Sequence, residues 1–196
     1  IEAHGVSAMS MAFLTREKTP MVWRGPMASG ALQQMIESTR WGELDVLFVD
    51  MPPGTGDIQL TLSQRTRLAG AVVVTTPQDI ALIDARRAIE MFQKVSVPII
   101  GMVQNMATHI CSNCGHEDPV FGSDGGQTLA NEYEAPVLAN IPLSRVIRET
   151  SDAGAPISAI DKDGSVGGAY REAAAAIMAT LSGSEAPRGP TISMTE

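Results

Sequence analysis

Three short hydrophobic runs, rich in β-branched residues and almost free of internal charge, stand out along the chain. They cover residues 45–50, 70–76 and 98–105, and a weaker run covers residues 136–142. Runs of this kind are typical of parallel strands that helices cover on both faces. The sequence therefore predicts that these four segments are strands of one sheet.

Helical patterns separate the predicted strands, at residues 30–40, 79–94, 125–133 and 170–181. In the second of them, apolar side chains spaced three and four apart form one stripe, from Leu82 to Phe92. This alternation predicts an α/β fold, with a mostly parallel sheet, helices on both faces and right-handed crossovers. Ligands of such sheets bind at the carboxyl ends of the strands, so we expect ligand-binding residues just after Val49, Thr75 and Val103.

Composition and charge limit the possible partners and the number of domains. A chain of 196 residues suits one domain, which we expect at residues 1–182, followed by a disordered Ser-, Gly- and Pro-containing tail at residues 183–196. The net charge of −8 argues against a nucleic-acid or anionic-membrane partner. We see no apolar run near the roughly 20 residues that span a bilayer, and no signal-peptide pattern. We therefore expect a cytoplasmic protein, or an organelle-matrix protein in a eukaryote.

The only two cysteines, Cys111 and Cys114, form a Cys-x-x-Cys pair. A closed zinc site or an iron–sulfur cluster usually needs four ligands, and a second copy across a two-fold axis would supply the missing pair. The first hypothesis is therefore a metal or cluster shared within a homodimer. His109 and His116 leave open a zinc site within one chain, and a redox dithiol also remains open.

Asp50 opens the octet Asp-Met-Pro-Pro-Gly-Thr-Gly-Asp directly after the first predicted strand. An acid at the tip of a buried strand is costly unless it is paired, and in nucleotide-hydrolysing folds it holds Mg²⁺. The glycines that follow, Gly54 among them, let backbone N–H groups approach a phosphate. The alternative is an ordinary strand-to-helix turn in which Asp50 caps the helix.

Two further residues follow predicted strands and could contact a nucleotide base. Asn105 ends the third strand, and its carboxamide offers the donor and the acceptor that suit a purine edge. Pro142 ends the fourth strand and could pack against the same base. The alternative for Asn105 is a polar strand end that caps the next turn.

Several motifs occur in an order that closely resembles the Mrp/ApbC-type iron–sulfur carrier ATPases. They are Trp-Arg-Gly-Pro-Met at residues 23–27, the octet at 50–57, Val-Thr-Thr-Pro-Gln-Asp at 74–79, Asn-Met at 105–106, the cysteine pair and Ile-Pro-Leu at 141–143. The resemblance runs from about residue 5 to about residue 156. That family belongs to the deviant-Walker P-loop class, which also holds MinD and the nitrogenase iron protein.

The resemblance implies a homodimer that binds ATP and Mg²⁺ in each subunit. It also implies a [4Fe–4S] cluster that is held between the subunits and handed to apo iron–sulfur proteins. Carried over by position, Cys111 and Cys114 would be cluster ligands, and Asp50 would be the catalytic Walker B acid near Mg²⁺. Gly54 would lie in the switch segment that senses the γ-phosphate, and Asn105 would read the adenine.

The family's phosphate loop, Gly-Lys-Gly-Gly-x-Gly-Lys-Ser/Thr, does not occur in the sequence. This predicts that the chain is the C-terminal part of a longer, slow ATPase, incomplete at its N-terminus and inactive as it stands. Two other functions compete with the carrier. A MinD/ParA-type positioning ATPase would be expected to carry a basic amphipathic helix near its C-terminus. A non-catalytic, zinc-bridged interaction module would be expected to bind zinc in place of a cluster.

Overall fold

The computed structural model describes residues 1–13, 25–52 and 57–183. It divides into two compact units, Ile1–Thr66 and Arg67–Glu196, and each is described by itself. The single domain expected at residues 1–182 stays a prediction. Of the expected tail at residues 183–196, all but Gly183 lies outside the described residues.

The first unit consists of a small hairpin and two helices. Its elements are β1 (Glu2–Ala3), β2 (Val6–Ser7), the 3₁₀-helix η1 (Met11–Phe13), α1 (Gly25–Ser38) and α2 (Asp57–Arg65). β1 and β2 pair with each other in antiparallel fashion. α1 and α2 pack together with Leu62 buried, and Arg65 Nη1 donates a hydrogen bond of 2.9 Å to Gln33 Oε1.

The strand predicted at residues 45–50 is wrong. These residues form no strand, and the only strands in the described part of this unit are β1 and β2. An extended segment is stable as a strand only when its backbone groups find a neighbouring strand, and no such neighbour pairs with this one. Two of its apolar side chains, Leu47 and Phe48, are accordingly left in solvent, 39% and 67% exposed. Asp50 is also exposed, so it does not stand at the tip of a buried strand.

The second unit is built around a sheet of four strands. Its elements are β3 (Ala71–Thr75), α3 (Asp79–Lys94), β4 (Ile99–Ile110), β5 (Glu117–Asp118), α4 (Gly125–Glu132), β6 (Val137–Leu143), α5 (Arg145–Asp152), α6 (Ile157–Ile160) and α7 (Ser165–Gly183). β4 lies in the centre, parallel to β3 and to β6, and the short β5 pairs antiparallel with its far end. The prediction of a mostly parallel sheet is therefore confirmed.

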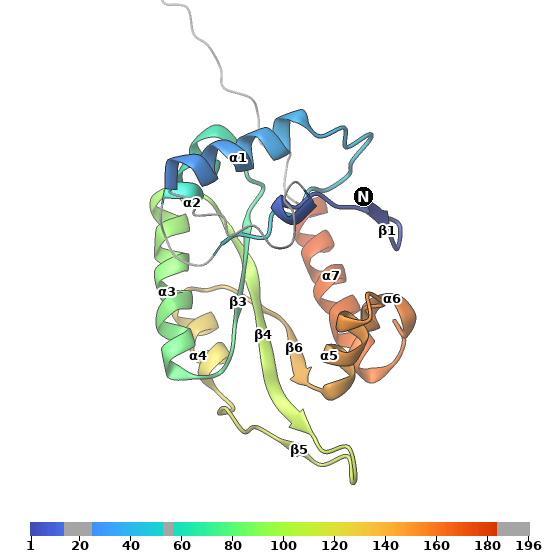
Figure 1. Cartoon of the computed structure of the whole chain (residues 1–196). Helices are drawn as coiled ribbons and strands as arrows, with labels where there is room; N and C mark the ends of the chain where they lie inside the picture. The colour runs from blue at the N-terminus through green and yellow to red at the C-terminus, as the bar shows by residue number, and fades with distance from the viewer. Residues whose placement is uncertain (14–24, 53–56, 184–196) are drawn as a thin grey trace, which may run out of the picture. The chain divides into compact units, whose positions relative to one another are not determined.

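Helices cover both faces of this sheet, as predicted (Figure 1). α3 and α4 lie on one face, where the fully buried Ile89, Met102 and Leu129 belong to one core cluster. α7 lies on the other face, where Ile141 and Ala173 belong to a second cluster. The two clusters separate because successive side chains of a strand point to opposite faces.

Four features of the second unit lie outside the sequence prediction. β4 continues past Asn105 to Ile110, β5 forms a hairpin with it, α5 follows β6, and the short α6 precedes α7. α5 is only eight residues long and has two apolar residues, Val146 and Ile147, of which only Ile147 packs against a core cluster, so its pattern in the sequence is too short to stand out. Among the described residues, no helix combines the length and the apolar character that a membrane crossing requires.

Candidate metal centre and nucleotide edge

Cys111 and Cys114 lie in the turn between β4 and β5. The hairpin is paired up to this turn, with His109 facing Asp118 and Ile110 facing Glu117. Cys111 N–H then donates to the His116 carbonyl at 2.9 Å, which closes the turn. In Figure 1 this hairpin extends beyond the ends of β3 and β6. The sequence thus places both thiols at the tip of a paired, projecting element.

Gly115 gives the turn its shape. Its φ of +71° lies in the left-handed region, and its N–H donates to the Cys111 carbonyl at 2.9 Å. A Cβ atom at this position would meet nothing within 4 Å, so the requirement for glycine is one of backbone conformation rather than of space. This is the conformation that a tight turn around two sulfur ligands needs.

The hairpin also changes the acidity of one thiol. Cys111 is half-buried, Cys114 is exposed, and both are free cysteines. The backbone N–H of Asn113 lowers the pKa of the Cys111 thiol most, followed by the backbone and side chain of Cys114, and these outweigh the opposing effect of burial. The thiolate is the form of cysteine that binds a metal. The turn therefore favours the ligating form of Cys111.

A complete metal site within one chain is not found in the described part of the structure. No group of three or more His, Cys, Asp and Glu side chains lies close enough together there to hold a metal ion. His109 and His116, although they flank the cysteines in sequence, do not join them in such a group. A four-ligand centre on this hairpin would therefore need ligands from outside it.

Asn105 and Pro142 come together at the carboxyl edge of the sheet. Asn105 of β4 faces Ile141 of β6 in the register, and Pro142 is the next residue of β6. Both are half-buried, and Asn105 Oδ1 accepts a hydrogen bond of 3.0 Å from the Met106 N–H. The other nucleotide candidates differ: Asp50 belongs to the first unit, and Gly54 lies outside the described residues.

Gln104 is a site residue that the sequence analysis missed. Its side chain is 6% exposed, its Oε1 accepts from the Gly126 N–H at 2.8 Å, and its Nε2 donates to Asn140 Oδ1 at 3.2 Å. One side chain thus joins β4, β6 and the start of α4, directly beside Asn105. The available signal was a glutamine inside an otherwise apolar strand pattern, where a polar group must find partners.

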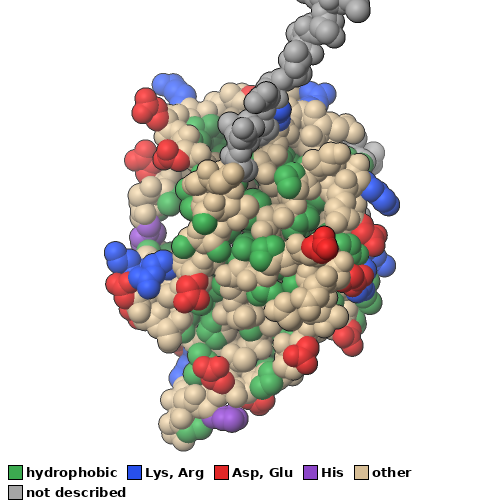
Figure 2. Space-filling view, turned by 180° about the vertical axis from the view of Figure 1, so that it is seen from behind, with side chains coloured by type: hydrophobic (Ala, Val, Ile, Leu, Met, Phe, Trp, Pro, Cys, Tyr) green, Lys and Arg blue, Asp and Glu red, His purple; other side chains and the backbone are tan. Residues whose placement is uncertain are grey.

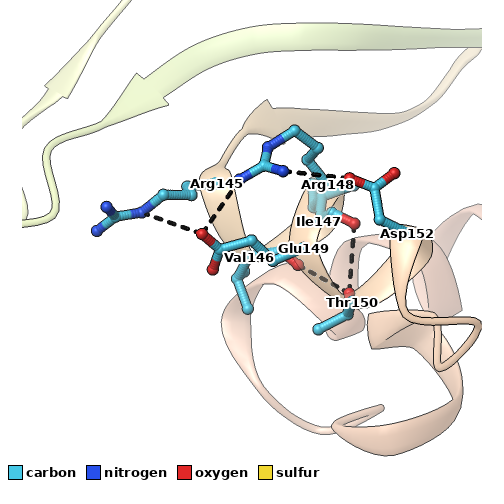
Figure 3. Close-up of polar contacts among 7 residues, drawn as sticks. All are labelled: Arg145, Val146, Ile147, Arg148, Glu149, Thr150 and Asp152. Carbon is cyan, nitrogen blue, oxygen red and sulfur yellow. Dashed lines mark hydrogen bonds and ion pairs between the residues drawn. The ribbon is translucent and has the colours of Figure 1, made fainter.

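α5 begins three residues after Pro142, and its charged side chains contact one another (Figure 3). Arg148 contacts Asp152 at 3.1 Å and Glu149 at 3.2 Å, and Arg145 lies 3.9 Å from Glu149. Across the face in Figure 2, acidic and basic side chains are likewise interspersed. The arginines nearest the nucleotide edge in sequence are therefore already paired with carboxylates.

The parallel sheet with helices on both faces is an α/β fold, and comparison with known proteins places it in the P-loop NTPase class. The cell division ATPase MinD of Pyrococcus furiosus aligns with 77% of this chain and 58% of its own, with a TM-score of 0.56 and 22% identity, which is a likeness of fold. A nucleotide-binding protein of Archaeoglobus fulgidus, solved with ADP and cobalt, aligns with 65% of this chain and 53% of its own. Its TM-score is 0.59 and its identity 36%.

The family model described as ParA, NUBPL iron-transfer P-loop NTPase, matches residues 1–178, and the chain belongs to this family. The resemblance found in the sequence is thereby confirmed. The iron–sulfur cluster carrier protein of Pseudomonas fragi is 58% identical over 174 residues, which are 89% of this chain and 61% of that protein. The iron–sulfur cluster transfer protein NUBPL of Mus musculus is 50% identical over 154 residues, 79% and 48% of the two chains. The chain thus spans about half the length of the curated relatives it matches.

Proposed function

We propose that this chain binds an iron–sulfur cluster through Cys111 and Cys114 and delivers it to apo iron–sulfur proteins. The observation that carries the proposal is the hairpin, which presents two free thiols at an accessible tip and favours the thiolate of Cys111. Family membership and the carrier names of the relatives support it. Free thiols of this kind suit a reducing compartment, the cytoplasm or an organelle matrix.

The same ligand count supports a homodimer. One chain supplies two sulfur ligands, and the described residues hold no group of three potential ligands. A [4Fe–4S] cluster takes four thiolates, which two copies of the hairpin would supply across a two-fold axis. Shared ligation would leave the cluster at an interface, where a change in the dimer can expose it to a recipient.

Nucleotide chemistry belongs to the longer protein in this proposal. Asn105 and Pro142 would contact the adenine, Asp50 would hold Mg²⁺, and Gly54 would sense the γ-phosphate. Mg²⁺ would neutralise phosphate charge during a slow hydrolysis. The 196 residues lack the lysine-containing phosphate loop, so we expect them to show no appreciable ATP binding by calorimetry. A low-micromolar affinity for ATP would contradict this expectation.

The direct test is anaerobic reconstitution with iron and sulfide, followed by metal and sulfide analysis. Cys111→Ser and Cys114→Ser should each reduce loading to near background, because each removes a ligand. Ser112→Ala, between the two cysteines, is the matched control and should load like the unchanged chain. Normal iron loading in Cys111→Ser would refute the ligand assignment. One tightly bound zinc per chain, with no iron uptake, would instead favour the zinc-bridged interaction module.

A further inference from the structure

The long strand β4 contains a break in its pairing, between the nucleotide edge and the cysteine hairpin. Pairing with β3 ends at Gln104, and pairing with β5 begins at His109. On the other side, β6 pairs Ile141 with Asn105 and Leu143 with His109. In the registers of the described strands, residues 106–108 of β4 therefore stand opposite the single residue Pro142.

Pro142 explains why the extra residues are tolerated at this position. Proline has no backbone N–H, so it cannot donate a ladder hydrogen bond to β4. A strand with extra residues opposite such a position bulges, and a bulge changes the direction of the strand beyond it. The strand beyond this bulge runs directly into the cysteine hairpin.

Met106 holds the bulge in an unusual backbone conformation. Its φ is +55°, which is uncommon for a residue other than glycine. Its side chain is exposed, so packing against neighbouring side chains constrains it little. The hydrogen bond from the Met106 N–H to Asn105 Oδ1, at 3.0 Å, is the contact that fixes it. A strained residue fixed by one side chain is a feature typical of switch segments.

We propose that Asn105 and Met106 form a joint that sets the direction of the cysteine hairpin, and that a purine base which engages the Asn105 carboxamide loosens it. The second half of this inference rests on the proposed nucleotide site. An exocyclic amino group of the base would compete with the Met106 N–H for Asn105 Oδ1. Because Asn105 precedes the bulge and Pro142 stands opposite it, a base bound against these two residues would bias the position of the thiols.

The joint can be tested on this chain by electron–electron spin distances. One nitroxide is attached to Cys114 in the Cys111→Ser background, and the other to Ala175→Cys on the exposed face of α7, which packs on β6. Met106→Gly relieves the backbone constraint and should broaden the distance distribution about twofold, since glycine adopts many more conformations than methionine. An unchanged width would overturn the joint.

Two matched controls separate the joint from a general loss of structure. Glu134→Gly replaces another non-glycine residue of positive φ, +53°, at the end of α4, and should leave the distribution unchanged. Asn105→Asp keeps an acceptor oxygen and should behave like the unchanged chain, whereas Asn105→Leu removes it and should broaden the distribution as Met106→Gly does. Equal broadening in Glu134→Gly would contradict a role specific to Met106.

The coupling to a nucleotide requires the same label pair in a form that carries the phosphate loop. Addition of ATP and Mg²⁺ should shift or broaden the distance, and Met106→Gly should abolish the difference between the free and bound states. ATP that binds without any change in distance would overturn the coupling and leave the proposed function intact. Failure of ATP to bind would instead overturn the nucleotide part of the proposed function. The distance distributions of the Met106 and Asn105 variants would still test the joint.

Discussion

At the scale of single residues, the backbone of the cysteine turn prepares a side chain for its chemistry. The N–H groups that follow Cys111 lower the pKa of its thiol, and Gly115 supplies the left-handed conformation that brings the chain back. The sequence predicted the cysteine pair and the proximity of Asn105 to Pro142, because the carboxyl ends of neighbouring parallel strands share one edge. It could not predict the partners of Gln104, which come from β6 and α4.

The acidity of Cys111 gives a pH-dependent prediction. Because its pKa is lower in the folded chain than in the unfolded chain, ionisation favours folding; this contribution is present above the unfolded pKa and is lost as the pH falls through the folded pKa. Alkylation of Cys111 by iodoacetamide, followed by mass spectrometry, should therefore reach half its maximal rate at a lower pH in the folded chain than in urea. Asn113→Ala keeps the backbone N–H and should retain the difference, whereas coincident profiles would contradict it.

Gln104 gives a prediction about stability. Gln104→Leu leaves the buried Gly126 N–H without an acceptor, which should lower the free energy of unfolding by about 1–3 kcal/mol in urea titrations. Gln127→Leu, which removes an exposed hydrogen bond on the surface of α4, should change it by less than about 0.5 kcal/mol. Similar losses in the two variants would show that burial of the Gln104 contacts does not matter.

At the scale of elements, the sequence pattern predicted those helices and strands whose apolar residues form a clear pattern of their own. It failed where the formation of a strand depends on pairing with a neighbouring strand. The stripe of α3 and the β-branched runs of β3 and of the first half of β4 predicted those elements well. The equally apolar run at residues 45–50 forms no strand, because a strand also needs a partner. The antiparallel end of β4 was missed because His109 and its neighbours interrupt the apolar pattern.

Substitutions at two adjacent glycines of α7 can show how closely α6 and the turn after it pack against that helix. A Cβ on Gly167 would clash with the Asp161 carbonyl oxygen, whereas one on Gly168 would meet nothing within 4 Å. Gly167→Ala should therefore destabilise the protein by about 1–3 kcal/mol, since backbone must move. Gly168→Ala should be neutral or stabilising by up to about 1 kcal/mol, because alanine favours a helix. Thermal unfolding of both variants checks the pair, and an equal response would contradict this packing.

At the scale of the whole molecule, the account depends on what one chain lacks. It presents two thiols on a projecting hairpin, and the described residues gather no further ligands around a metal. Asn105 and the start of the hairpin belong to the same strand, β4, so in the proposed function the nucleotide and the cluster would both act on this strand. Oligomeric state was open to prediction from the sequence only through the ligand count, because a dimer surface carries no periodic pattern of its own.

The most direct test of shared ligation is native mass spectrometry of the anaerobically reconstituted chain. The account predicts one species with the mass of two chains and a single [4Fe–4S] cluster, which returns to single chains when the cluster is removed by chelation. Cys114→Ser should abolish that species. A single chain that carries a complete cluster would contradict the claim that two hairpins hold one cluster. A dimer that persists after the cluster has been removed would also contradict it.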